Sequence, residues 1–543
     1  MNQSPRRKTV KPFGGHDPDL IKINRVMSPR LFFILPGPLC TALLLHLAFS
    51  SSRFWPCIWF AFIPLCWSVR TQLPGRAFIQ GIIAGFAFYY LNLFWITNSI
   101  RNFSALPIPI ALVIMALLAI YLGLYFGFFS FLLAKNPPVS WVSILFLASC
   151  WTLLEWLRGN LFVGFPWHNL GTALSPGSPF TLLLPYVGVY SLSFVIITTN
   201  LALYSLIFNQ DNNHFMIRRI ATLLAVPILY FLLLAASHTG IASLDKSLPL
   251  KVSIIQPNIP QEEKWNPAYR QRNFTLLEEM SLESAATSTS EIPHLVIWPE
   301  ASLPDFFQDA PLFRQRISTL TRQGNFYLLA GSPQYDTDSA GKHHYFNSAL
   351  LFSPGGKLIA GYDKIKLVPF GEFTPLADYF PFLGKMVPGA DFTAGRPQKP
   401  MDLDNFSLVP SICFEGIFPE FVAGSMAKDS GFLVNITNDA WFGISSGPRQ
   451  HLLNVRMRAM ENRCYLLRCA NTGISAIISP DGQIIKQLPL GKRGQLEAII
   501  YPTISPTIYA RHPYLLILLL TVMAAGCKIY MQQWPLKSPS GFP

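Results

Sequence analysis

Three residues that can do chemistry stand just past apolar runs of the sequence. Glu300 ends LVIWPE, Lys364 lies in AGYDKIKLVPFGEF, and Cys413 lies in VPSICFE. A glutamate can accept a thiol proton as a general base, and a lysine can favour the thiolate and stabilise an oxyanion. The thiolate can then attack an acyl carbon. If the fold brings these side chains together, they form a usable set for nucleophilic acyl chemistry.

Simpler interpretations of the same residues stay open at this point. A glutamate after Trp-Pro is commonly a solvated loop acid, a lysine at a strand end is commonly exposed, and a cysteine in an apolar run is commonly core. Cys413 can also be half of a disulfide, or pack beside Cys464 or Cys469. Histidine is the usual partner of a nucleophilic cysteine, and none of the ten histidines lies near Cys413 in the sequence.

The segment that carries these residues, 238–513, is the one large polar region of the chain. It contains short β-branched apolar runs that end in turn residues, with helical stretches such as 267–287 and 449–463 between some of them. Continuous apolar strands are typical of sheets that are buried on both faces. We therefore expect one layered α/β domain in which the loops after the strands present the reactive groups.

Outside that segment the chain is apolar enough to belong in a membrane. Of its 543 residues 51% are hydrophobic and 13% are charged, and its mean hydropathy is +0.33. Stretches near the ~20 residues of a bilayer-spanning helix predict eight spans. They are 31–49, 55–69, 77–97, 105–134, 141–157, 179–208, 218–237 and 514–531. The second and fifth are short, so the alternative is that one of them is re-entrant.

Basic residues set the expected orientation of these spans. Lys and Arg, which give a net charge of +13, gather before the first span and at alternate ends of later ones, as cytoplasmic sites do. Seven spans in 31–237 and an eighth at 514–531 then leave 1–30 and 532–543 in the cytoplasm and 238–513 outside it. The basic extension 1–30 has no clear small-residue cleavage site, so we expect a retained anchor. The charge is therefore topological, and no nucleic-acid partner is expected.

The spacing of the cysteines and histidines does not indicate a metal site. The eight cysteines include no CxxC pair, and five of them fall inside apolar segments. His343 and His344 are the only adjacent histidines. We expect neither a structural metal nor a disulfide framework.

Taken in order, the motifs resemble the Glu-Lys-Cys signature of the nitrilase superfamily. VIWPE contains Glu300, YDKIKLVPFGEF contains Lys364 and Glu372, and ICFEGIFPE contains Cys413. More narrowly, the flanking spans and the strings QPNIPQEEKW, LVPFGEFTPL and NDAWFG are similar to the apolipoprotein N-acyltransferase family. The resemblance covers nearly the whole chain, with its motifs inside 252–475. It implies a nitrilase-like αββα sandwich outside the cytoplasm, joined to a polytopic helical membrane domain.

The resemblance also implies a role for each motif residue. Glu300 matches the general base, Lys364 the lysine that stabilises the oxyanion and the thiolate, and Cys413 the nucleophile. Lys366 is a local rival to Lys364, because the two lysines share a face if the segment is a strand. The eight-residue step from the lysine to the glutamate of PFGE selects Lys364. Glu372 matches a further acid that orients the lysine.

Other residues match supporting positions of the family. Glu415 matches an acid close behind the nucleophile, and Trp265 and Trp441 resemble aromatic residues beside the site that bind substrate. The alternatives are a loop acid for Glu372, a strand-end acid for Glu415 and ordinary packing for the two tryptophans. Phe414 stands where the family often has tyrosine, so it offers no hydroxyl, and its backbone N–H is a candidate oxyanion donor.

The function implied by the resemblance is a two-step acyl transfer that needs no cofactor and no metal. A phospholipid, expected to be phosphatidylethanolamine, acylates Cys413, and the α-amine of the diacylglyceryl-cysteine of an apolipoprotein then takes the acyl chain. The expected location is a bacterial inner membrane, with the catalytic domain in the periplasm. One alternative is a membrane-tethered amidase that hydrolyses a carbon-nitrogen bond. The other is a lipid-binding or transport protein with an inactive outer domain, which predicts a broken triad.

Overall fold

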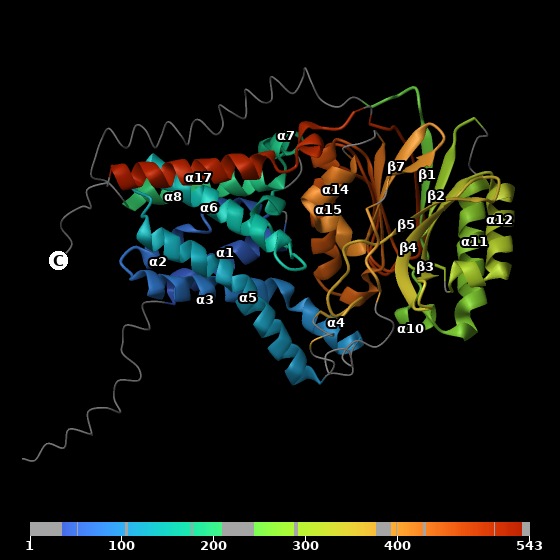
Figure 1. The fold of residues 1–543 in the computed structure, drawn as a ribbon, viewed down its shortest axis with the longest axis horizontal. Helices are drawn as coiled ribbons and strands as arrows, with labels where there is room; N and C mark the ends of the chain where they lie inside the picture. Colours follow the sequence, from blue (N-terminus) through green and yellow to red (C-terminus); the bar gives the residue numbers. More distant parts are fainter. Residues whose placement is uncertain are drawn as a thin grey trace, which may run out of the picture.

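The computed structural model has a helical part and a β-sandwich that lie side by side (Figure 1). It describes residues 35–51, 53–103, 107–174, 178–208, 244–286, 291–303, 305–375, 379, 392–397, 399–426, 431–503 and 505–534. The last helix, α17 (Leu515–Gln533), packs against α6 (Trp141–Asn160) in the helical part. The chain therefore leaves the helices, builds the sandwich and returns to the helices.

The helical part is made mainly from the first half of the chain. Its other helices among the described residues are α1 (Pro36–Ser50), α2 (Ile63–Val69), α3 (Pro74–Leu93), α4 (Trp95–Phe103), α5 (Ile108–Lys135), α7 (Leu184–Val187) and α8 (Val189–Phe208). The outward faces of the longest helices expose large apolar side chains, such as Leu117 and Phe128 of α5 and Val522 of α17. Apolar side chains over such a large surface suit contact with lipid.

Four of the described helices are long and apolar enough to cross a membrane: α5, α6, α8 and α17. The pair α3 and α4 would supply a fifth span, but it is bent by 57°. The predicted spans 31–49 and 55–69 coincide with shorter apolar helical segments, and 218–237 lies outside the described residues. Eight spans, their orientation and the outside location of 238–513 stay predictions.

Two of the helix boundaries that differ from those expected lie beside local features of the backbone. Helix α8 begins at Val189, later than the predicted span 179–208, because Gly188 adopts φ +71° and ends the short helix α7 before it. At the bend after α3, side-chain amides donate to backbone carbonyl groups that otherwise accept only helix N–H groups. The Asn92 amide donates to the Phe88 carbonyl at 2.8 Å, and the Gln450 amide of the sandwich donates to the Asn92 carbonyl at 2.9 Å.

The sandwich contains two six-stranded sheets among the described residues, ordered β12-β1-β2-β3-β4-β5 and β11-β10-β9-β8-β7-β6. Three neighbouring strands of each sheet are parallel, namely β1-β2-β3 and β7-β8-β9, and the flanking pairs are antiparallel. The strands are β1 (Leu250–Gln256), β2 (His294–Ile297), β3 (Tyr327–Thr337), β4 (His343–Phe352), β5 (Leu358–Asp363), β6 (Met401–Leu403), β7 (Phe406–Ile412), β8 (Phe432–Thr437), β9 (Leu466–Ala470), β10 (Ser475–Ile478), β11 (Ile484–Leu488) and β12 (Gly494–Ile500).

Helices cover the outer face of each sheet and complete an αββα sandwich (Figure 1). Helices α11 (Arg270–Ala286) and α12 (Pro311–Gly324) cover the first sheet, and α14 (Pro419–Met426) and α15 (Gly447–Asn462) cover the second. Strands β2, β8 and β9 are buried at every residue, as expected for strands with both faces covered. The predicted layered α/β fold and its αββα form are confirmed.

The apolar core beneath α14 and α15 continues into the helical part. Met457 of α15 and Val422 of α14 belong to the same buried cluster as Trp167 and Leu192 of the helical part. Helix α15 contacts the second sheet on one side and the helical part on the other (Figure 1).

Candidate active site

Glu300, Lys364 and Cys413 lie just beyond the ends of three strands. Glu300 follows β2, Lys364 follows β5 directly, and Cys413 follows β7 as the first residue of a 3₁₀ turn, Cys413–Ile417. Because β2 and β5 belong to one sheet and β7 to the other, the three residues bring both sheets into one site. Their exposed fractions are 6%, 0% and 8%.

Lys364 lies between two carboxylates. Its Nζ is 2.8 Å from Oε1 of Glu372 and 3.6 Å from Oε1 of Glu300. Burial alone would lower the pKa of Lys364, but the two carboxylates outweigh burial and hold that pKa above its ordinary value. Lys366 instead places its Nζ over the Phe418 ring at 5.3 Å, and β5 ends before either lysine, so the premise of a shared strand face is wrong.

Asn347 of β4 connects the two acids, and the sequence motifs did not point to it. Its Nδ2 donates to Oε1 of Glu300 at 2.7 Å and to Oε1 of Glu372 at 2.9 Å. The backbone N–H of Asn438 donates to the other oxygen of Glu300 at 2.7 Å. Both oxygens of Glu300 are therefore held in place. The available signal was an amide beside the apolar run that becomes the buried half of β4, because a buried amide needs hydrogen-bond partners.

Cys413 is a buried thiol in a strained turn. Burial raises the pKa of the thiol to about 12, with Glu300 acting in the same direction and Lys364 and the Thr437 hydroxyl opposing it. At neutral pH the resting group therefore carries its proton, and attack requires a base. The backbone φ of +53° is rare for a residue with a side chain and costs about 1–3 kcal/mol.

Two side chains hold the carbonyl oxygen of Cys413. Asn435 donates to it at 3.2 Å, and Nε2 of His451 lies 3.1 Å from it. This Nε2 must carry the hydrogen, because a carbonyl only accepts. Burial and then Arg468 lower the pKa of His451, so the ring is neutral, and its Nδ1, which carries no hydrogen, accepts from the Arg468 guanidinium at 3.1 Å. The histidine absent from the local sequence thus reaches the backbone of Cys413 from α15.

Glu415 ties the lysine segment to the nucleophile turn. One carboxylate oxygen accepts the backbone N–H groups of Ile365 and Lys366 at 2.6 and 3.0 Å, and the other accepts that of Ile412 at 2.7 Å. The Tyr362 hydroxyl donates to the same carboxylate at 2.9 Å. Burial raises the pKa of Glu415 to about 7, and these N–H donors oppose the rise. The side chain therefore acts on the backbone beside two site residues.

Two protein-family models match the chain. That of the apolipoprotein N-acyltransferase N-terminal domain matches residues 41–202, and that of carbon-nitrogen hydrolase matches residues 251–511. An apolipoprotein N-acyltransferase of Geobacter metallireducens is 35% identical over 478 residues, which are 87% of this chain and 90% of that protein. The chain belongs to the apolipoprotein N-acyltransferase family. Apolipoprotein N-acyltransferases of Nitrosomonas europaea and Haemophilus ducreyi are 33% and 29% identical over 80% and 94% of this chain, and 84% and 99% of their own length.

The aromatic residues singled out by the resemblance to N-acyltransferases lie in different surroundings. Trp265 is 48% exposed at the end of a short helix. Trp441 is 36% exposed, and its backbone carbonyl accepts from the Ser99 hydroxyl of α4 at 2.6 Å. Phe414 is buried, and its ring centre lies 6.4 Å from that of Phe165 in the helical part. Their substrate-binding roles, and that of the Phe414 N–H, stay predictions.

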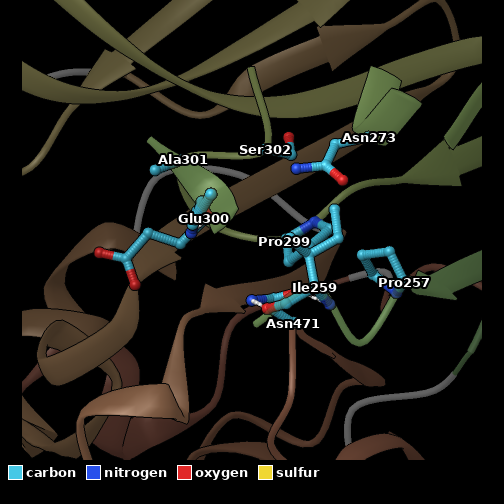
Figure 2. Close-up of a pocket in the computed structure, with 9 residues that line it drawn as sticks. Pro257, Ile259, Asn273, Pro299, Glu300, Ala301, Ser302 and Asn471 are labelled. Carbon is cyan, nitrogen blue, oxygen red and sulfur yellow. Dashed lines mark hydrogen bonds between the residues drawn. The ribbon is translucent and has the colours of Figure 1, made fainter. Parts of the chain in front are cut away.

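A small pocket of this N-acyltransferase lies beside Glu300 (Figure 2). It is lined by Pro257, Ile259, Lys264, Asn273, Pro299, Glu300, Ala301, Ser302 and Asn471. Figure 2 shows the Glu300 carboxylate extending away from the other labelled residues, so the backbone of Glu300 lies nearer to them than its acid group. Lys264 of α10 (Gln261–Lys264) donates its Nζ to the Glu300 carbonyl at 2.8 Å. A second lysine therefore lies buried behind the proposed base.

Proposed function

We propose that this N-acyltransferase moves a fatty acyl chain from a membrane phospholipid to the α-amine of the diacylglyceryl-cysteine at the N-terminus of an apolipoprotein. The observation that supports it best is the convergence of Glu300, Lys364 and Cys413 from two sheets into one buried site. The exposed apolar helices beside that site suit substrates that both reside in a bilayer. Phosphatidylethanolamine is the proposed donor.

In the first step, Glu300 takes the proton of the Cys413 thiol, and the thiolate attacks the ester carbonyl carbon of the phospholipid. Lys364 stabilises the oxyanion that forms, because its ammonium stays charged inside the site. As the carbon-oxygen bond breaks, the leaving alkoxide takes the proton from Glu300. The products are a lysophospholipid and a thioester on Cys413.

In the second step, the α-amine of the acceptor attacks the thioester carbonyl, and Glu300 accepts a proton from the nitrogen. The carbon-sulfur bond then breaks, the proton returns to the sulfur, and an amide remains on the acceptor. Asn347 and the Asn438 N–H hold Glu300 at the same place for both steps. The burial of Cys413 protects the thioester from water.

We place the sandwich on the periplasmic side of an inner membrane with both termini in the cytoplasm. The support for this orientation is the distribution of Lys and Arg along the sequence. Labelling single introduced cysteines on either side of intact cells with an impermeant maleimide would test it.

A transfer assay tests the function itself. Purified protein is mixed with phosphatidylethanolamine that carries a labelled acyl chain and with a diacylglyceryl-cysteine peptide. We expect a labelled amide on the peptide that resists hydroxylamine, and none with the Cys413→Ala variant. Labelled fatty acid released at one rate with or without the peptide would contradict transfer and favour the hydrolase alternative.

A further inference from the structure

We infer that Lys264 is a positioning residue for the proposed acyl transfer. Its ammonium fixes the backbone of Glu300 and balances the negative charge that forms on Cys413. This inference rests on the proposed function and adds a second cation to its site. This lysine lies in the string QPNIPQEEKW, but the Glu-Lys-Cys set does not include it.

The contacts of Lys264 are unusual for a lysine. It is 6% exposed, although lysine is almost never fully buried unless it is paired. Its Nζ donates at 2.8 Å to a neutral group, the backbone carbonyl of Glu300, and it lines the pocket behind that residue. A buried ammonium bonded to a neutral carbonyl needs negative charge nearby to stay favourable.

That negative charge comes from the active site. Burial lowers the pKa of Lys264 to about 8, and the Glu300 carboxylate opposes the decrease, as does Cys413 once its thiol has lost its proton. The two acids therefore stabilise the ammonium, and by the same interaction the ammonium stabilises the two acids. Lys264 remains charged at neutral pH.

Counting the charges around the reacting thiol shows what Lys264 contributes. Of the groups that contact Lys364, Glu300 and Glu372 carry two negative charges against the one positive charge of the lysine, so these three sum to one negative charge. Asp439 also acts on Cys413, but it is paired with Arg468 and that pair adds no net charge. With Lys264 the sum is zero. When the proton moves from Cys413 to Glu300, the negative charge moves to sulfur and the sum stays zero. Without Lys264, the thiolate forms in a buried site that is already negative, which is costly.

The experiment measures the reactivity of Cys413 in the full-length protein without any lipid substrate. Iodoacetamide is added, and mass spectrometry follows alkylation of the peptide that contains Cys413. Lys264→Gln keeps an N–H donor for the Glu300 carbonyl but removes the charge. We expect alkylation of this variant to be about tenfold slower than wild type near pH 7. Lys264→Arg, which keeps the charge, should alkylate close to the wild-type rate.

The pH dependence separates charge from packing. Near pH 9.5 wild-type Lys264 is neutral, so the deficit of Lys264→Gln should largely disappear. Glu300 and Cys413 act on the charge of Lys264. Glu262 and Glu263 precede it on its own helix, Glu263 pairs with Arg272, and both proteins contain all of these groups. A deficit of equal size at both pH values would indicate a packing role and overturn the inference. Equal rates near pH 7 would overturn it as well.

Two further proteins keep the test decisive. If Lys264→Gln does not fold, the test is the alkylation rate of Cys413 in Lys264→Arg divided by that in wild type. This ratio must rise between about pH 7 and pH 9.5, because arginine stays charged while the wild-type lysine loses its charge. A constant ratio would overturn the inference. Lys251→Met is the matched control. Lys251 lies near the start of β1, whereas Lys264 follows the end of that strand, and Lys251 pairs with Glu497. Because no lipid is used, failure of the acyl-transfer proposal leaves this result readable.

Discussion

Asn347 is the side chain through which the two acids around Lys364 are joined. Replacing it with leucine removes both hydrogen bonds, to Glu300 and to Glu372, and leaves two buried carboxylate oxygens with a partner lost. Hydrogen bonds to charged groups contribute about 1.5–3 kcal/mol each, so we expect acyl transfer by Asn347→Leu to fall about ten- to a hundredfold.

The rate of labelled amide formation checks this prediction, with thermal unfolding measured beside it. Ser348→Ala is the matched control, because the Ser348 hydroxyl of the same strand bonds Asp363 instead of the two acids. A wild-type rate in Asn347→Leu would show that Glu300 and Glu372 need no shared donor.

Some site residues could be predicted from the sequence and others could not. Glu300, Lys364 and Cys413 each follow an apolar run in a distinctive string, and the structure brings them together. Asn347 and His451 have no such string, and their contacts join residues 47 and 38 positions apart. Which polar side chains meet across two sheets depends on tertiary packing that local patterns do not encode.

At the scale of elements, α15 connects the nucleophile turn to the bent helix pair α3 and α4. His451 of α15 contacts the Cys413 carbonyl, and the preceding residue, Gln450, contacts the helical part. The Gln450 Oε1 accepts the indole N–H groups of Trp95 and Trp167 at 2.9 and 3.0 Å. Two adjacent residues of α15 therefore bind the nucleophile turn and the helical part, respectively.

We expect Gln450→Leu to weaken that connection. The change leaves two buried indole donors and the Asn92 carbonyl without the Gln450 amide, at a cost of about 1–3 kcal/mol for each unsatisfied group. The thermal midpoint should fall, and acylation of Cys413 from phospholipid vesicles should slow about tenfold or more. Asn454→Ala is the control, because the Asn454 amide bonds within α15. Unchanged acylation in Gln450→Leu would contradict the coupling.

The elements that could be predicted are those with a local signal. The runs that became β2, β7 and β8, and the helices near 267–287 and 449–463, follow from apolar patterning and turn residues. At the bend after α3 the Asn92 carbonyl accepts from Gln450, a residue more than 300 positions away, and no window of sequence contains both. The short apolar segment Trp55–Val69 has the bounds of the predicted stretch 55–69, and Pro36–Ser50 overlaps the predicted stretch 31–49.

At the scale of the whole molecule, buried acids lie where the sandwich meets the helical part. Glu461 of α15 accepts the backbone N–H of Val189, the first residue of α8, at 2.9 Å, and Arg458 pairs with it at 2.8 Å. Burial raises the pKa of both Glu461 and Glu420 to about 7, with Arg458 opposing the rise in each. One arginine faces two acids. When both acids are ionised, this joint between the sandwich and the helical part therefore holds more negative than positive groups.

This excess predicts how stability depends on pH. The pKa of Glu420 in the folded protein lies above its ordinary value of 4.5. Its contribution to the free energy of unfolding is therefore fully present below about pH 4.5 and is lost as the pH rises towards 7. Glu420→Gln has no charge to bury and should be about 1–3 kcal/mol more stable than wild type at pH 8. Thermal unfolding between pH 5 and 8 should also show a shallower slope.

Glu283→Gln serves as the control, because Glu283 is an exposed acid on α11. Its replacement should leave the dependence of the thermal midpoint on pH as in wild type. An unchanged midpoint at pH 8 in Glu420→Gln would mean that the joint does not carry an uncompensated acid.

Capture of the thioester tests the central claim most directly. The protein is incubated with vesicles of phosphatidylethanolamine carrying an isotope-labelled acyl chain, without acceptor, and is then denatured in acid and mapped by mass spectrometry. We predict the label on the peptide that contains Cys413, its release by neutral hydroxylamine, and its loss when a diacylglyceryl-cysteine peptide is added before denaturation. Labelled amide forming at the normal rate while Cys413 stays unmodified, or in a Cys413→Ala variant, would contradict the account.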